Sequence, residues 1–159
     1  MAQPFTLGRG LILLGNVAYS LGAFIADFNE THVLNPRWPP HAKFHNGQTM
    51  TLGVLLASMS TYFLFRPTRS LEQIKDNLWT AAMIGSFYCA AGLCAILYPG
   101  TAWQEYVFLS ESHCRTLLME SSPEFPGNGE QRYVFGGVCI LMWLGYWLEG
   151  RRLPGVKNA

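Results

Sequence analysis

Residues 77–104 read NLWTAAMIGSFYCAAGLCAILYPGTAWQ and contain no Asp, Glu, Lys or Arg. A transmembrane helix needs about 20 consecutive, mostly apolar residues, and this stretch reaches that length before Pro99 and Gly100. A second uncharged stretch, residues 46–65, reads NGQTMTLGVLLASMSTYFLF. Each stretch is long enough to cross a bilayer alone, so the pair predicts two membrane-spanning helices in the middle of the chain.

Two shorter uncharged stretches, residues 10–26 and 133–148, lie on either side of this central pair. Their polar flanks extend them to spanning length, so we predict four spans at about 9–30, 45–65, 77–99 and 130–149 within a single transmembrane domain, 1–159. Arg9 is the one basic residue ahead of the first uncharged stretch, residues 10–26. We therefore expect that span to be an uncleaved anchor rather than a signal peptide.

The composition of the 159 residues agrees with a membrane protein. Half of the residues are hydrophobic and 13% are charged, whereas an ordinary soluble domain carries about 25% charged residues. The formal net charge of +1 provides no basic field for nucleic acid. Four cysteines without a CxxC pair indicate neither a disulfide framework nor a zinc site.

Short links between spans favour antiparallel neighbours, so we predict an all-α, up-down-up-down four-helix bundle in the bilayer. Small residues recur in each span and are expected where helices approach closely. They are Gly15, Ala18, Gly22, Gly53, Ala57, Ser60, Gly85, Cys89, Gly92, Gly136 and Gly137.

The loop charges predict the orientation. Basic residues favour the cytosolic side, and those on the side of the two termini outnumber those in the other loops. The former are Arg9, Arg66, Arg69, Lys75, Arg151, Arg152 and Lys157. We expect both termini in the cytosol and the protein in the endoplasmic reticulum, with the first and third loops lumenal.

The segment between the first two spans is unusually polar. Residues 27–50 read DFNETHVLNPRWPPHAKFHNGQTM and hold two acids and three histidines. A polar stripe from Asn16 to Asp27 follows one face of the first helix and should point into the bundle. On the second helix, His41, His45 and Gln48 recur at helical spacing. We expect the polar faces of the first and second helices to meet at one end of the bundle.

Acid beside imidazole is suited to general acid–base catalysis near neutral pH. Polar residues at helix ends also occur in the headgroup zone without a specific role, and that alternative remains open. The predicted catalytic residues are Asp27, Glu30, His41 and His45. The predicted substrate-binding residues are Asn16, Tyr19, Asn29, His32, Trp38, Asn46, Gln48, Trp103, Glu105 and Tyr106.

A zinc or iron site on the same acids and histidines is an alternative. However, Ala42, Lys43 and Phe44 separate the two histidines, so the motif is not HExxH, and a lysine between ligands disfavours a metal. We predict no metal and no cofactor.

The stretches DFNETHV (27–33) and NPRWPPHAKFHNGQ (35–48) resemble small four-span membrane proteins of fungal secondary-metabolite clusters. That family includes epoxide hydrolases and cyclases of polyene polyketide pathways of the citreoviridin and aurovertin type. The architecture is also similar to that of the sterol-isomerase and sigma-2-receptor superfamily, but no residue roles carry over from it.

These features together predict a membrane-embedded, cofactor-independent acid–base enzyme that opens an epoxide in a lipophilic small molecule, giving a diol or a cyclic ether. An isomerase or terpene-type cyclase is the first alternative, and a non-enzymatic sterol- or lipid-binding protein is the second. The expected partners are the substrate and the bilayer, with room for a homodimer and no role for nucleic acid.

Overall fold

A computed structural model of the chain describes residues 3–30, 32–101, 103 and 130–154. Over these residues the protein is all helical and has no strand. Each of its helices is long and apolar enough to cross a membrane. The helices are α1 (Leu7–Asp27), α2 (Pro40–Phe65), α3 (Leu71–Ala95) and α5 (Glu130–Arg152). The predicted all-α bundle of four spans is confirmed.

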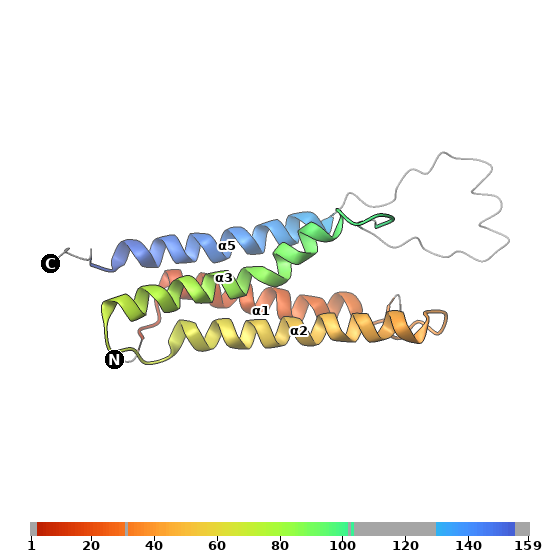
Figure 1. The fold of residues 1–159 in the computed structure, drawn as a ribbon, viewed down its shortest axis with the longest axis horizontal. Coiled ribbons are helices and arrows are strands. Elements are labelled where there is room, and N and C mark those ends of the chain that lie inside the picture. The colour runs from red at the N-terminus through yellow and green to blue at the C-terminus, as the bar shows by residue number, and fades with distance from the viewer. Residues whose placement is uncertain (1–2, 31, 102, 104–129, 155–159) are drawn as a thin grey trace.

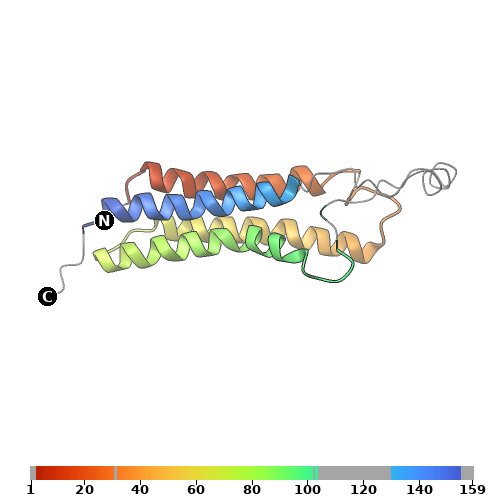
Figure 2. The same ribbon diagram turned by 90° about the horizontal axis from the view of Figure 1, so that it is seen from above.

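The four helices run side by side along the long axis of the molecule (Figure 1). α1 packs against α2 and α5, and α3 packs against the same two helices, with a smaller diagonal contact between α1 and α3. Figure 2 shows α1 beside α5 and α2 beside α3. Both termini lie at one end of the bundle, here called the terminal end; the opposite end, where α1 ends and α2 begins, is the hairpin end.

Local signals at the helix ends explain where the helices differ from the predicted spans. Pro40 occupies the first turn of α2, where its fixed φ suits a helix and its missing N–H is not needed. The side chain of Ser70 caps α3 by accepting from the backbone N–H of Gln73 at 3.2 Å. α2 and α3 therefore begin before residues 45 and 77, and α1 ends at Asp27 rather than at residue 30.

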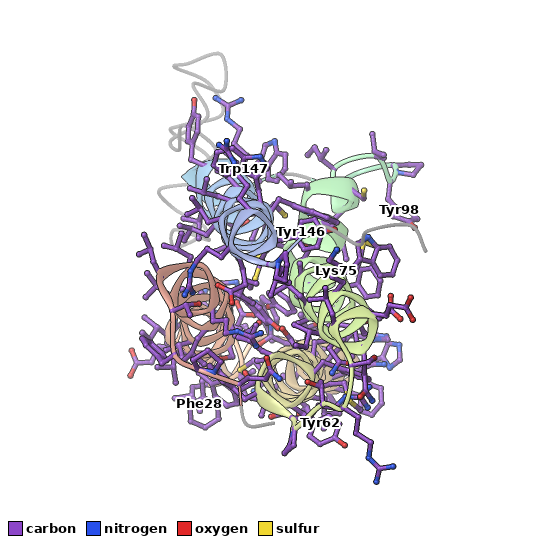
Figure 3. All side chains as sticks on the ribbon, turned by 90° about the vertical axis from the view of Figure 1, so that its left-hand side faces the viewer. Phe28, Tyr62, Lys75, Tyr98, Tyr146 and Trp147 are labelled. Carbon is purple, nitrogen blue, oxygen red and sulfur yellow. The ribbon has the colours of Figure 1, made fainter. Side chains whose placement is uncertain are left out.

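The outside of the bundle is apolar. Leu21 is 59% exposed and Leu55 is 61% exposed, which is unfavourable in water but suits contact with lipid tails. Viewed from the terminal end, Phe28, Tyr62 and Trp147 project outward from three different helices or their ends (Figure 3). The exposed surface thus matches a membrane-embedded bundle.

Glycines allow α1 and α5 to approach closely. A Cβ added at Gly8 would lie 2.7 Å from the carbonyl oxygen of Gly145, and one at Gly145 would lie 2.5 Å from that of Gly8. A Cβ at Gly15 would meet Met142 Cε at 2.6 Å. Small residues at helix interfaces are the usual means of close packing in membranes. The prediction that small residues lie at close helix contacts is wrong for Gly22, Gly136 and Gly137, since nothing lies within 4 Å of a Cβ built there.

Candidate functional site

Asp27, the last residue of α1, is the half-buried acid at the hairpin end. Its side chain is 19% exposed, and its Oδ1 lies 4.0 Å from Nε2 of His32. The side chain of Asn46, on α2, also lies near enough to the Asp27 carboxyl group to interact with it. The acid therefore lies near an imidazole and a carboxamide, but the imidazole belongs to His32, a predicted binding residue, and not to His41 or His45.

The turn after α1 brings His32 back over Asp27. The backbone N–H of Val33 donates to the Asp27 carbonyl at 3.1 Å, and that of Leu34 donates to the Asn29 carbonyl at 2.9 Å. The His32 ring then packs edge-on against Trp38, with ring centroids 5.0 Å apart. Local hydrogen bonds and one aromatic contact therefore fix the imidazole near the acid.

An aromatic pair lies on the bundle side of this acid. Tyr19 of α1 stacks on Tyr88 of α3 with centroids 5.3 Å apart and planes 13° apart. Tyr88 is near enough to Asp27 for a direct electrostatic interaction. Gly53 makes room on α2, because a Cβ there would lie 3.3 Å from the Tyr88 ring. Tyr88, which stacks on Tyr19, is therefore the aromatic residue within electrostatic range of the acid.

Four buried side-chain polar atoms have no hydrogen-bond partner among the described residues, and two of them belong to predicted site residues at or toward the hairpin end. They are Oδ1 of Asn46 and the hydroxyl group of Tyr19, whose residue is 3% exposed. Buried polar atoms are normally paired, so the unpaired oxygen of Asn46, whose side chain lies beside Asp27, indicates a place where a polar ligand group would be favourable.

His41 and His45 share one face of α2, as their spacing predicts. Their Nε2 atoms lie 3.0 Å apart, and both side chains are exposed. No ion pair within the described residues joins either histidine to Asp27 or Glu30, and Glu30 is exposed. Asn46 faces Asp27 instead; a neighbouring helical residue such as His45 points about 100° away. Of the four predicted catalytic residues, the described structure therefore pairs His41 with His45 and gives neither histidine an ion pair with Asp27 or Glu30.

The other predicted binding residues divide between the hairpin end and the helix interior. Asn29 caps the end of α1 by donating to the carbonyl groups of Ile25 and Ala26 at 3.2 and 2.7 Å. Gln48 Oε1 lies 3.3 Å from His45 Nδ1. Trp103 is half-buried. Glu105 and Tyr106 lie outside the described residues.

Asn16 belongs to a hydrogen-bond chain across the middle of the bundle. Its Nδ2 donates to Ser60 Oγ at 2.9 Å, and Ser60 Oγ donates to the Ala81 carbonyl at 2.8 Å. A Cβ at Gly85 would lie 2.9 Å from Asn16 Oδ1, so this glycine leaves room for the Asn16 side chain, whose oxygen has no hydrogen-bond partner among the described residues. Asn16 therefore joins α1, α2 and α3 in the bundle interior and is about 16 Å along the helix axis from Asp27.

The terminal end holds a buried ion pair that the sequence analysis missed. Arg9 Nε lies 3.1 Å from Glu149 Oε1, and both side chains are 3% exposed. Arg9 also donates to the Leu64 carbonyl and, at 2.8 Å, to Gln3, while Thr6 donates to Glu149 at 2.5 Å. Opposite charges at the same end of the first and last spans were the available signal, but Arg9 was counted as a loop residue.

The donor set at the hairpin end suits proton transfer. Among the described residues, no group of three or more His, Cys, Asp or Glu side chains could hold a metal ion. Asp27 and His32 can each give or accept a proton, and the aromatic faces of Tyr19 and Tyr88 can stabilise positive charge nearby.

Comparisons with known proteins give one match. No curated protein and no solved structure is significantly similar to the chain. Residues 11–106 match DUF6640, described as a family of unknown function. This range contains Asp27, His32 and Asn46 but neither Arg9 nor Glu149. Because the match covers more than half of the 159 residues, the chain belongs to the DUF6640 family.

Proposed function

We propose that the hairpin end is the active site of a cofactor-independent acid–base enzyme that opens an epoxide in a lipophilic substrate. The observation that carries the proposal is the position of Asp27: a half-buried carboxyl group at the end of a spanning helix, held between His32 and Asn46. An acid at this depth costs free energy unless it has partners or a function.

In the proposed reaction, protonated Asp27 gives its proton to the epoxide oxygen as one ring C–O bond breaks. A hydroxyl oxygen forms a new bond to the same carbon, and its proton passes to His32. Protonated His32 then returns that proton to Asp27, its neighbour at 4.0 Å. Attack by water gives a diol, and attack by a hydroxyl group of the substrate gives a cyclic ether.

The stacked pair of Tyr19 and Tyr88 supports a role for positive charge. Aromatic faces stabilise cationic centres by roughly 0.5–2 kcal/mol, and the epoxide carbon gains positive charge as its C–O bond breaks. The same pair favours a second candidate, an isomerase or cyclase, in which Asp27 protonates a double bond and the rings stabilise the carbocation.

We further propose that the hairpin end faces the lumen of the endoplasmic reticulum. Arg66 and Arg69 lie between α2 and α3, and Arg151 and Arg152 lie in the last turn of α5. Basic residues at the terminal end favour a cytosolic position for that end. The bilayer would then concentrate the lipophilic substrate. The resemblance to fungal polyketide enzymes implies that this substrate belongs to secondary metabolism.

The test supplies a lipophilic polyene epoxide in oxygen-18 water to microsomes that contain the protein. Asp27→Asn and His32→Asn are compared with Glu30→Gln, a matched control at an exposed acid of the same turn. We expect turnover that falls about 10²–10⁴-fold in the first two variants and is unchanged in the control. Labelled diol would indicate attack by water, and unlabelled cyclic ether would indicate internal attack.

Equal turnover in the wild type and Asp27→Asn would contradict the assigned acid. An epoxide that survives in every sample, with the protein folded, would refute the epoxide reaction. The isomerase is then tested on the corresponding polyene, and ligand binding without turnover would favour the lipid-binding alternative.

A further inference from the structure

We propose that His41 and His45 form a two-histidine site for a divalent transition-metal ion on the exposed face of α2. The ion class is the one that prefers imidazole, namely Cu²⁺, Ni²⁺ or Zn²⁺. The site is independent of the proposed reaction at Asp27, because His41 and His45 contact each other, and His45 also contacts Gln48, whereas neither forms an ion pair with that acid among the described residues.

The separation of the two imidazole nitrogens fits one bound ion. An ion about 2.0–2.1 Å from each nitrogen, with a ligand angle between 90° and the tetrahedral angle, needs nitrogens about 2.9–3.4 Å apart. The Nε2 atoms of His41 and His45 are 3.0 Å apart. This value is near the right-angle end of the range, which is typical of the tetragonal sites that Cu²⁺ and Ni²⁺ prefer.

Gln48 favours the tautomer of His45 that such a site requires, with the proton on Nδ1. Nδ1 of His45 lies 3.3 Å from the side-chain oxygen of Gln48. An amide oxygen can only accept, so this contact places the ring proton on Nδ1 and leaves the lone pair of Nε2 facing His41. Metal-binding histidines usually donate their second ring nitrogen to an oxygen in this way.

The intervening lysine does not oppose the ion. Lys43 is two residues from each histidine, and residues two apart on an α-helix point about 200° apart around the axis. The positive charge therefore projects from the other side of α2. This removes the sequence-based objection to a metal at His41 and His45, and water would fill the remaining coordination positions of the exposed ion.

The experiment titrates Cu²⁺ into the purified full chain in detergent micelles and follows it by electron paramagnetic resonance. We expect one ion per chain with two imidazole nitrogens in its coordination sphere. His41→Ala and His45→Ala should each leave one nitrogen and weaken binding by about tenfold or more. Gln48→Ala should weaken binding by about tenfold. This is the lower limit of the loss that is usual when a residue hydrogen-bonded to a metal-binding histidine is removed.

Two variants serve as controls. His32→Ala removes an imidazole from the same end of the bundle, and Lys43→Ala removes the intervening charge; both should keep the two-nitrogen spectrum. Because His41 and His45 are exposed, the double variant should retain the helical circular dichroism of the wild type. A two-nitrogen spectrum in that double variant, or a single nitrogen in the wild type, would overturn the proposal.

Discussion

At each end of the bundle an acid lies beside a basic group, but the two ends differ in how deeply these groups are buried and how fully they are hydrogen-bonded. At the terminal end, Glu149 and Arg9 are both 3% exposed, and hydrogen bonds from Thr6 and to Gln3 surround them. At the hairpin end, Asp27 is 19% exposed, and the side-chain oxygen of its neighbour Asn46 has no hydrogen-bond partner in the part of the chain that the structure describes. An ion pair whose polar atoms all have hydrogen-bond partners stabilises a fold, whereas a group with an unpaired polar atom can hydrogen-bond to a substrate. We therefore assign structure to the first and chemistry to the second.

The largest expected effect is the loss of stability in Glu149→Ala. Removing one partner of a buried ion pair leaves the other charge unpaired, which costs about 3–5 kcal/mol. The free energy of unfolding, measured by titrating SDS into mixed micelles, should fall by about that amount. The paired replacement Arg9→Met with Glu149→Leu should recover most of it. A Glu149→Ala protein as stable as the wild type would remove the structural role from the terminal end.

The next effect concerns His32→Asn at the hairpin end. Loss of a general base lowers turnover by about 10²–10⁴-fold, while the free energy of unfolding should change little because this imidazole is partly exposed. The measurement is the initial rate of epoxide loss with the variant and the wild type at equal helical content. An unchanged rate would assign the base to another residue and weaken the contrast between the two ends.

A third effect tests the packing that holds α1 against α5. A Cβ at Gly145 would lie 2.5 Å from the carbonyl oxygen of Gly8, so Gly145→Ala should force the two helices apart. Overpacking of this kind costs about 1–3 kcal/mol, again measured by SDS titration. Gly136→Ala on the same helix meets nothing within 4 Å and is the matched control. Equal losses of unfolding free energy in the two variants would show that the close approach of α1 and α5 does not determine the stability.

The smallest effect is expected for Ser60→Ala in the middle of the bundle. The change removes one link of the chain from Asn16 to the Ala81 carbonyl. Hydrogen bonds between transmembrane helices contribute about 0.6 kcal/mol on average and up to about 1.7 kcal/mol. Thermal unfolding monitored by circular dichroism should show a modest fall, with turnover unchanged. A large loss of turnover would instead extend the active site into the bundle.

The sequence was sufficient for the fold because uncharged length and small residues determine it. Residues 77–104 and 46–65 are each long enough as helices to cross the hydrocarbon core of a bilayer, and short links make neighbours antiparallel. The same reasoning pointed Asp27 inward. It failed for Gly22, Gly136 and Gly137, because a glycine in a span does not show which way its face is turned.

The candidate site was only partly predictable. The inward position of Asp27 and the contact between His41 and His45 follow from helical spacing. The rotation of α2 about its axis decides whether His45 or Asn46 meets Asp27, and spacing does not specify it. His32 reaches the acid through turn hydrogen bonds such as Val33 to Asp27, which a sequence pattern does not reveal. Arg9 and Glu149 were missed because a charge beside a span is normally solvated.

The most direct measurement of the division between the two ends compares Asp27→Asn with Glu149→Gln, two matched replacements of a carboxyl group by an amide. Turnover of the lipophilic epoxide and the free energy of unfolding are measured for both proteins. Our account predicts that Asp27→Asn loses at least about 100-fold in turnover and keeps its stability, whereas Glu149→Gln loses stability and keeps turnover while folded. Full turnover in folded Asp27→Asn would contradict the account.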